Sequence, residues 1–327
     1  MRFAIVGAGA IGAFLGAMLA RAGEEVTLIA RGAHLEAMRN HGVRVRGSLG
    51  EFTAHPKVAE NPADVGIVDV VILTLKAHSI PEVAPRLKSI LGSETAVVTA
   101  QNGIPWWYFY RHGGDLEGLH LESVDPGRVI ATNIDPARAI GCVIYCSTIT
   151  TEPGVIEHLD GTRFAIGEPD GAKSERCRTI SEAIIRSGLR SPIRNNIRNE
   201  IWVKLLGSVA FNPISALTRA TLEDIVECQE TREIARAIMS EVEELARQLG
   251  VDLGITIEQR LAGAAKVGPH KTSMLQDVEA GRPLELDAIA GAVIELAGKL
   301  NLPMPHTKTV FACAKLLGEK SRNYGKN

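Results

Sequence analysis

The sequence predicts an α/β protein, with a doubly wound parallel sheet in the N-terminal half and an all-helical domain at the C-terminus. Short apolar, β-branched runs alternate with helical patterns in the first half, which is typical of βαβ units whose sheet is buried on both faces. The candidate strands are Phe3–Val6, Val26–Ala30, Val68–Leu75 and Ala96–Ala100, with a helix over Ala10–Ala22 between the first two. In the last third, apolar residues recur at three-to-four spacing over Leu222–Leu249, and Leu284–Leu300 is rich in Ala, Ile and Leu, so both segments are predicted to be helices.

Length and composition indicate a globular protein of two domains. The chain has 327 residues, and a domain averages about 150 residues. Ser191-Pro192 interrupts the pattern between the two halves, so we expect domains at residues 1–194 and 195–327. With 36 basic and 38 acidic side chains the net charge is −2, which lacks the positive excess of a general nucleic-acid binder.

The sequence favours a cytoplasmic protein without a metal ion or a membrane partner. The apolar run Phe3–Ala20 resembles a signal peptide, but its patterned glycines continue into one structural unit, and no other run reaches transmembrane length. The five cysteines form no CxxC pair, and none of the nine histidines falls in a ligand spacing.

Further strands are expected in the middle of the chain. The candidates are Val129–Ile130, Ile140–Ile149 and Arg163–Ile166. Pro153-Gly154 and Asp160-Gly161 are hairpin signals, so we expect an antiparallel addition to the sheet. The aromatic stretch Trp106–His120 is either a mobile loop near a site or a cluster that packs under the sheet, and we favour the cluster.

A glycine-rich turn, Gly7-Ala8-Gly9-Ala10-Ile11-Gly12, directly follows the first strand and opens the first helix. Gly7 permits the tight turn, Gly9 lets a pyrophosphate approach the backbone, and Gly12 allows close packing of helix on strand. The helix N-terminus then offers N–H groups to phosphates. The context predicts a Rossmann-type dinucleotide site. A glycine-rich turn without a ligand is the alternative interpretation.

Arg31 ends the second strand, where an NAD-specific site usually has an acidic residue that binds the ribose 2′-hydroxyl. A guanidinium suits a 2′-phosphate through its charge and bidentate geometry. The sequence therefore favours NADP(H) over NAD(H), unless Arg31 is only a solvated surface residue.

Lys204 lies in the middle of an otherwise apolar helical stretch, and Ser208 and Asn212 follow at successive turns, so the three share one polar stripe. A lysine in that setting is costly without partners. A functional amine and a lysine at a helix edge whose ammonium reaches water are equally compatible with the spacing.

Four other residues are candidates with a simple structural alternative. Glu285 lies in the first turn of a predicted helix and Ser273 precedes a helical run, so either could be a cap. Asn102 and Lys76 follow strands, where ligands bind at the carboxyl ends of a parallel sheet, but each could belong to an ordinary turn.

Taken together, these segments resemble the ketopantoate reductase (2-dehydropantoate 2-reductase) family over almost the whole chain. The markers are the glycine turn, Thr74-Leu75-Lys76-Ala77, Gln101-Asn102-Gly103, Ile197-Arg198 with Trp202 and Lys204-Leu205, Asn212-Pro213, Ser273-Met274-Leu275-Gln276-Asp277, and Glu285-Leu286-Asp287 with Gly291. Several ordered matches over two domains are more specific than the glycine motif alone.

The resemblance implies NADPH-dependent reduction of 2-dehydropantoate to (R)-pantoate, on the route to pantothenate and coenzyme A, in a cleft between the two domains. It implies that Lys204 donates the proton to the ketone oxygen and that Glu285 is the carboxylate beside this lysine and the nicotinamide. This agrees with the chemistry, because hydride arrival leaves an alkoxide that needs a cation and then a proton.

The remaining site residues follow from the same resemblance. The cofactor would be held by the glycine turn together with Arg31, Lys76, Asn102 and Glu285. The substrate would be held by Asn102, Lys204, Ser208, Asn212 and Ser273. By analogy with such helical domains, a homodimer is also expected.

Three positions depart from the family pattern and concern the substrate. The family usually has Asn where this chain has Ser208, Asn where it has Ala290, and Gln where it has Ser79. Two alternatives to a ketopantoate reductase therefore remain at this point: a paralogous NADPH-dependent reductase of another branched 2-oxo acid, and a dinucleotide-binding sensor without turnover.

Overall fold

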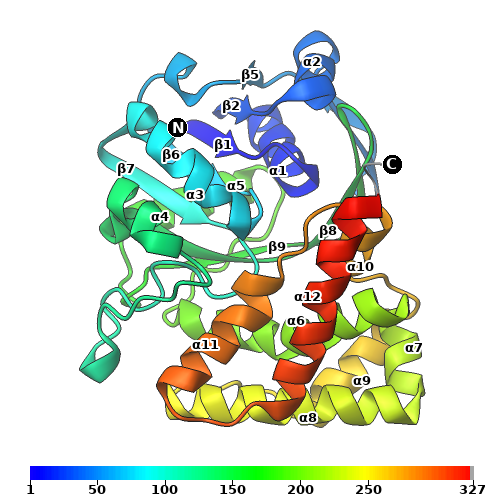
Figure 1. The fold of residues 1–327 in the computed structure, drawn as a ribbon. Helices are drawn as coiled ribbons and strands as arrows, with labels where there is room; N and C mark the ends of the chain where they lie inside the picture. The colour runs from blue at the N-terminus through cyan, green and yellow to red at the C-terminus, as the bar shows by residue number, and fades with distance from the viewer. Residues whose placement is uncertain (325–327) are drawn as a thin grey trace. The chain divides into compact units, whose positions relative to one another are not determined.

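The computed structural model describes residues 1–324 and divides into two compact units (Figure 1). The first, called here the sheet unit, comprises Met1–Gln101, Pro105–His120 and Asp125–Ile197. The second, the helical unit, comprises the described residues from Arg198 onward together with the short segments Asn102–Ile104 and Leu121–Val124. The two units are described separately.

The sheet unit is built on a nine-stranded sheet with the order β4-β3-β9-β8-β7-β6-β1-β2-β5. Its strands are β1 (Arg2–Val6), β2 (Glu25–Ile29), β3 (Val43–Gly47), β4 (Phe52–Ala54), β5 (Lys57–Ala59), β6 (Val68–Leu73), β7 (Leu91–Thr99), β8 (Ala139–Glu152) and β9 (Val155–Gly167). Strands β5, β2, β1, β6, β7 and β8 are mutually parallel, as the alternating pattern predicts. The α/β fold with a parallel sheet is thereby confirmed.

Helices cover both faces of this sheet. The helices of the unit are α1 (Ala10–Arg21), α2 (Gly32–His41), α3 (Ile80–Val83), α4 (Val129–Asn133) and α5 (Glu175–Arg186), with the 3₁₀-helix η3 over Ala84–Ile90. Phe3 and Ile5 of β1 pack in one core with α1 and α5, whereas Ala4 and Val6 pack in another with η3 and α4. Burial on both faces explains why these strands are continuous apolar runs.

The structure corrects two details in the middle of the chain. Pro153-Gly154 forms the turn between β8 and β9, which pair antiparallel as expected, but Asp160-Gly161 lies inside β9 at an irregularity of the pairing. Val129–Ile130, expected as a strand, begins helix α4. The side chain of Asp125 accepts hydrogen bonds from Ile130 N (2.6 Å) and Ala131 N (3.0 Å), which stabilises the start of that helix.

The aromatic segment packs on the sheet, as favoured from the sequence. Trp107, Tyr108 and Phe109 are buried. The indole of Trp107 donates a hydrogen bond to Thr99 Oγ1 at the end of β7 (2.8 Å). Residues 107–109 therefore form a satellite cluster of the core, whereas residues 110–120 are exposed or half-buried.

The helical unit contains α6 (Ile197–Thr218), α7 (Leu222–Glu227), α8 (Gln229–Gln248), α9 (Ile257–Val267), α10 (Ser273–Glu279), α11 (Ala292–Lys299) and α12 (Pro305–Tyr324). The helix expected over Leu222–Leu249 is divided between α7 and α8. The helix expected over Leu284–Leu300 begins later and opens with a π-helical turn, Asp287–Gly291, before α11. Such turns are often found at functional sites.

One helix, α6, is long and apolar enough to cross a membrane by length and composition. However, 67% of its most apolar 18-residue window is buried inside the protein, as in the core helix of a globular protein. The prediction of a helical C-terminal domain is confirmed.

Candidate active site

The glycine turn after β1 adopts the tight conformation that the sequence predicts. Gly7 has φ +99°, and Gly9 N donates a hydrogen bond to Gly7 O (2.7 Å). A Cβ on Gly7 would lie 2.7 Å from Leu75 N, so a side chain would collide with the backbone that follows β6. Both the backbone angle and the available space therefore require glycine at position 7.

Thr74 fixes this turn against the first helix. Its hydroxyl donates to Gly7 O (2.7 Å), and a Cβ on Gly12 would lie 2.5 Å from Thr74 Oγ1 and would overlap Gly7 O. Gly12 therefore allows α1 to approach the strand ends closely. Thr74 is not among the site residues predicted from the sequence, although its position directly after β6 indicates contact with the glycine turn.

The N-terminus of α1 is open to a ligand. Its N-cap residue, Gly9, has no side chain to accept hydrogen bonds from the first turn, where Ala10, Ile11 and Gly12 lie. A Cβ built on Gly9 meets nothing within 4 Å. Unpaired N–H groups that face open space form the arrangement that binds phosphate.

A cavity of about 420 Å³ adjoins the turn. Its lining comes from the glycine turn, the end of β2, the start of α2 and the segments after β5 and β6: Val6, Gly7, Ala8, Gly9, Ile29, Ala30, Arg31, His34, Glu60, Pro62, Leu75, Ser79, Glu82, Val83 and Arg86. Apolar walls with a few polar groups are typical of a small-molecule site. Together with the open helix N-terminus, they fit the adenosine and phosphate part of a dinucleotide.

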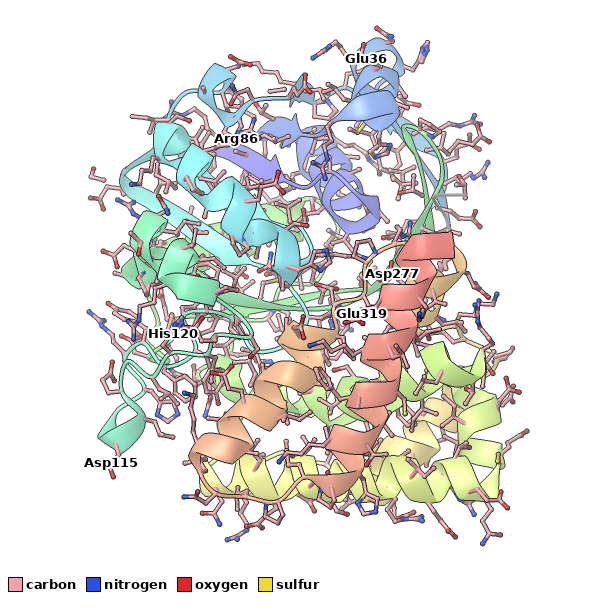
Figure 2. All side chains as sticks on the ribbon, viewed as in Figure 1. Glu36, Arg86, Asp115, His120, Asp277 and Glu319 are labelled. Carbon is pink, nitrogen blue, oxygen red and sulfur yellow. The ribbon has the colours of Figure 1, made fainter. Side chains whose placement is uncertain are left out.

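Two cations and two carboxylates contribute to the cavity wall. Arg31 lies exposed at the N-cap of α2, and Arg86 lies on η3 (Figure 2). Glu60 follows β5, whose Ala59 pairs with Ile29 of β2, so Glu60 and Arg31 follow neighbouring strand ends. Glu60 is not among the residues predicted from the sequence, because the three-residue strand β5 that positions it was not predicted. The lining does not include Lys76, which is half-buried at the start of the 3₁₀-helix η2 (Ala77–Ser79).

His34 also lines the cavity and was missed. Its Nδ1 accepts a hydrogen bond from Gly154 N (2.9 Å), so the neutral imidazole carries its proton on Nε2. Nε2 is buried and faces the backbone of Ala8 outside the geometry of a regular hydrogen bond. Burial lowers the pKa of His34 and outweighs the opposing effect of the Ala8 backbone, so neutral pH favours this uncharged form.

In the helical unit, α6 carries the polar stripe expected from the sequence. Lys204 is half-buried in a turn that also contains the buried side chains of Trp202, Leu205 and Leu206. Asn212, two turns further on, is 9% exposed. A half-buried lysine on a largely apolar helix is compatible both with a functional amine and with a lysine whose stem is buried while its ammonium reaches water.

Ser208 and Ser273 differ in their availability to a ligand. The Ser208 hydroxyl donates to Lys204 O in the preceding turn (3.0 Å). Ser273 is exposed at the first position of α10, and the N-cap is Thr272, whose side chain accepts from Leu275 N. The capping alternative for Ser273 is therefore wrong.

The structure brings Asn102 and Glu285 together. Asn102 Nδ2 donates to Glu285 Oε2 at 3.5 Å, across 183 residues of sequence. The next residue, Gly103, has φ +91°, and a Cβ there would overlap Ala288 O of the π-helical turn. Ile104 N then donates to the same carbonyl (3.1 Å). The segment after β7 is thereby anchored beside Glu285. Glu285 was expected in the first turn of a helix, but it lies just before the π-helical turn that begins at Asp287.

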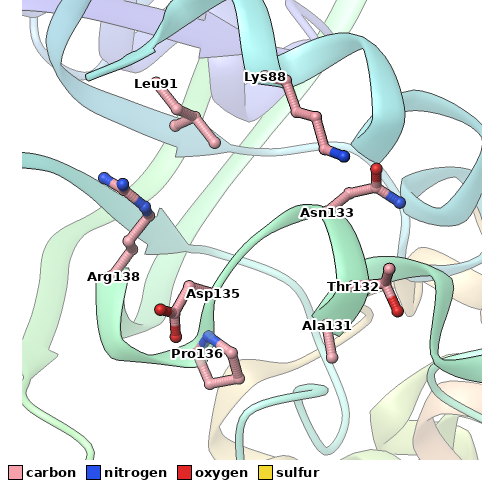
Figure 3. Close-up of a pocket in the computed structure, with 8 residues that line it drawn as sticks. All are labelled: Lys88, Leu91, Ala131, Thr132, Asn133, Asp135, Pro136 and Arg138. Carbon is pink, nitrogen blue, oxygen red and sulfur yellow. The ribbon is translucent and has the colours of Figure 1, made fainter. Parts of the chain in front are cut away.

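A second cavity of the sheet unit, of about 450 Å³, lies between η3 on one side and α4 with the segment that follows it on the other (Figure 3). Lys88 and Arg138 line it, but the Arg138 guanidinium donates to the carbonyls of Gly92, Ser93 and Thr95. The guanidinium of Arg138 therefore stabilises the backbone at the start of β7, and its donors are directed to these carbonyls rather than to a ligand. Within residues 1–324, the structure brings together no group of three or more potential metal-ligating side chains.

Two family models match the chain. The model described as ketopantoate reductase PanE/ApbA matches residues 3–171, and the model of its C terminal matches residues 196–318. A 2-dehydropantoate 2-reductase from Mesorhizobium japonicum is 46% identical over 318 residues, covering 97% of this chain and 98% of that protein.

Solved structures give the same result. A protein from Ralstonia solanacearum MolK2 is 36% identical, with a TM-score of 0.93 and 98% of both chains covered. The 2-dehydropantoate 2-reductase from Geobacter metallireducens is 27% identical, with a TM-score of 0.84 and coverage of 97% of this chain and 99% of that chain.

Proposed function

The chain belongs to the ketopantoate reductase family, and we propose that it reduces 2-dehydropantoate to (R)-pantoate with NADPH. NADPH supplies the hydride to C2 of the substrate, and one proton is added to the ketone oxygen. The glycine turn, the N-terminus of α1 and Arg31 would hold the phosphates of the cofactor. Lys76 and Asn102 would add cofactor contacts.

Lys204 is the proposed proton donor. Its ammonium stabilises negative charge as it develops on the ketone oxygen, and then transfers a proton from Nζ to that oxygen. Half-burial removes part of the water that would otherwise weaken this interaction. In the proposed mechanism Glu285 keeps Lys204 charged, while Asn212 and Ser273 bind the substrate.

The observation that carries the proposal is the Asn102–Glu285 contact. The family resemblance assigns these residues to one reaction centre although they lie 183 positions apart, and Asn102 Nδ2 lies 3.5 Å from Glu285 Oε2. The glycine of the Gln101-Asn102-Gly103 marker is what lets this segment approach the backbone at Ala288. A glycine-rich dinucleotide binder without turnover has no need of this arrangement.

Loss of NADPH absorbance on addition of ketopantoate tests the proposed function. We expect turnover with NADPH, slower turnover with NADH, and a higher kcat/KM for ketopantoate than for other branched 2-oxo acids. Normal NADPH binding without consumption in the presence of any 2-oxo acid would reject the enzyme. A higher kcat/KM for another branched 2-oxo acid would identify that acid as the substrate.

We also propose that the protein acts in the cytoplasm as a homodimer. The proposal of a dimer rests on analogy with such helical domains, and Ile234 on α8, Val267 on α9 and Leu316 on α12 are large apolar side chains exposed on this unit. Light scattering after size-exclusion chromatography measures the mass in solution, and a monomeric mass at micromolar concentration would reject the dimer.

A further inference from the structure

We propose that Arg260 binds the carboxylate of the 2-oxo acid substrate, in a position that Gly207 makes available one turn from Lys204. This inference rests on the proposed function and adds to it a binding residue that neither the sequence motifs nor the family resemblance assigns.

The substrate carries a negative charge close to the ketone on which Lys204 acts. A 2-oxo acid carries its carboxylate on the carbon next to the ketone, about 1.5 Å along one C–C bond. If Lys204 acts on the ketone oxygen, the group that binds the carboxylate must reach the surroundings of the Lys204 ammonium. The other side chains assigned to the substrate (Asn102, Ser208, Asn212 and Ser273) are all neutral.

Arg260 reaches this part of α6 from a neighbouring helix. It lies in the first turn of α9, whose start is fixed by a capping box between Thr256 and Gln259. The guanidinium occupies the space where a Cβ of residue 207 would be, with Cζ 2.6 Å from that position. Gly207 is three residues after Lys204, so the two positions share one side of α6.

Gly207 is therefore the residue that admits the guanidinium. Gly207 is buried in the interior of a 22-residue helix, where glycine costs about 1 kcal/mol relative to alanine. Any side chain at this position would displace the guanidinium. The helix therefore has a residue of low helix propensity at position 207, and this residue leaves room for a cationic group against the helix.

Ser208 adds a second reason for a donor from outside α6. The family pattern has an amide at this position, whose NH₂ group donates hydrogen bonds. Here the hydroxyl proton of Ser208 is donated to Lys204 O, so Ser208 offers a substrate no hydrogen. Arg260, over the adjacent Gly207, restores a donor and adds a charge.

An arginine suits the proposed ligand chemically. Its planar fork forms two parallel hydrogen bonds with a carboxylate, which a lysine cannot form. Nε of Arg260 is buried, and an ion pair is stronger where water is excluded.

The test compares four variants: Arg260→Gln, Arg260→Lys, Gly207→Ala and the control Arg236→Gln. Arg236 is an exposed arginine of α8 that pairs with Glu258 of α9 (2.9 Å), so its variant makes the same chemical change next to α9. The substrates are ketopantoate and its neutral lactone, which keeps the ketone but has no free carboxylate. NADPH oxidation gives kcat and KM, protein fluorescence gives the Kd of NADPH, and calorimetry gives the Kd of pantoate in the presence of NADP⁺.

Arg260→Gln is expected to raise KM for ketopantoate and Kd for pantoate roughly 10- to 100-fold, the effect of losing a charge-assisted hydrogen bond. The Kd of NADPH and the kcat/KM for the lactone should not change. Arg260→Lys keeps the charge and should lose less, Gly207→Ala should resemble Arg260→Gln, and Arg236→Gln should match the parent.

Two results would overturn the inference: an unchanged KM and pantoate Kd in Arg260→Gln, or an equal loss with the acid and the lactone, which indicates a structural role. Failure of the proposed function is seen separately, in the parent protein. If the parent prefers another 2-oxo acid, the variants are compared with that acid. If it turns over none and binds no pantoate, both proposals are rejected.

Discussion

Two glycines of the turn after β1 should fail in opposite ways when each is replaced by alanine. At Gly12 a Cβ would overlap Gly7 O and lie 2.5 Å from Thr74 Oγ1. At Gly9 a Cβ meets nothing within 4 Å, and the backbone there (φ −72°, ψ −162°) accommodates any residue. Gly12→Ala should therefore damage the fold, whereas Gly9→Ala should damage cofactor binding alone.

The magnitudes follow from these contacts. Overpacking at Gly12 costs about 1–3 kcal/mol, and disturbing the Thr74 hydrogen bond to Gly7 O costs about 1 kcal/mol more. Helix propensity returns up to about 1 kcal/mol, so Gly12→Ala should lose about 2 kcal/mol. For a unit of this size, the corresponding fall in Tm is roughly 4–8 °C.

Gly9→Ala should leave Tm unchanged and raise the Kd of NADPH roughly 10- to 100-fold, because the added methyl occupies the space in which a phosphate meets the backbone N–H groups. Calorimetric melting and fluorescence titration measure the two effects. Gly263→Ala on α9, also with nothing within 4 Å, calibrates the propensity gain. Normal NADPH binding by Gly9→Ala, or equal losses of Tm in the two variants, would refute this assignment of the turn.

Three further predictions concern charged side chains. Lys204→Ala should lower kcat about 10²- to 10⁴-fold with an unchanged Kd for NADPH, since a proton donor is lost and no cofactor contact; a kcat within a few-fold of the parent, by the absorbance assay, would exclude Lys204 from the mechanism. Arg31→Gln should raise the Kd of NADPH roughly 10- to 100-fold and leave the Kd of NADH unchanged, as measured by fluorescence titration of both cofactors. An equal rise in both Kd values would show that Arg31 does not bind the 2′-phosphate. Burial raises the pKa of Glu241, but hydrogen bonds from Thr307 and His306 outweigh this effect and hold the pKa below its ordinary value of 4.5. The ionised carboxylate therefore stabilises the start of α12 in full above pH 4.5. This stabilisation is lost as the pH falls through the lowered pKa. The stability difference between the parent and Glu241→Gln, about 1 kcal/mol at pH 7, should shrink in denaturation curves below pH 4.5, and a difference that grows with acid would contradict this sign.

The sheet could be predicted where its determinants are local. Each central strand is buried on both faces, so its apolar run is visible in the sequence, and the glycine turn has fixed spacing. The prediction of a strand at Val129–Ile130 was wrong. Two β-branched residues indicate a strand, but the preceding Asp125 and Pro126 are residues that favour the start of a helix. The cap, rather than the apolar pair, determined the local structure.

Only those site residues that belong to recognisable sequence motifs could be predicted. His34 and Glu60 enter the cavity because the β8–β9 turn contacts α2 and because β5 pairs with β2. Arg260 reaches α6 from a helix more than fifty residues later in the chain. Long-range pairings of this kind leave no periodic signal in the sequence, so no pattern within a short window could indicate them.

The composition of the cofactor cavity explains why one arginine should decide the choice of cofactor. Arg31 and Arg86 are balanced by Glu60 and Glu82, so the wall has no net charge to attract a phosphate by itself. Selectivity must then come from the position of Arg31, at the end of β2 and the N-cap of α2, where its fork and the helix N-terminus favour the same anion. Without Arg31 the wall keeps one arginine against two carboxylates, which repels a 2′-phosphate, whereas Glu60 is then well placed to accept a hydrogen bond from the ribose hydroxyl of NADH. Arg31→Gln should therefore reverse the preference between the two cofactors rather than merely weaken both.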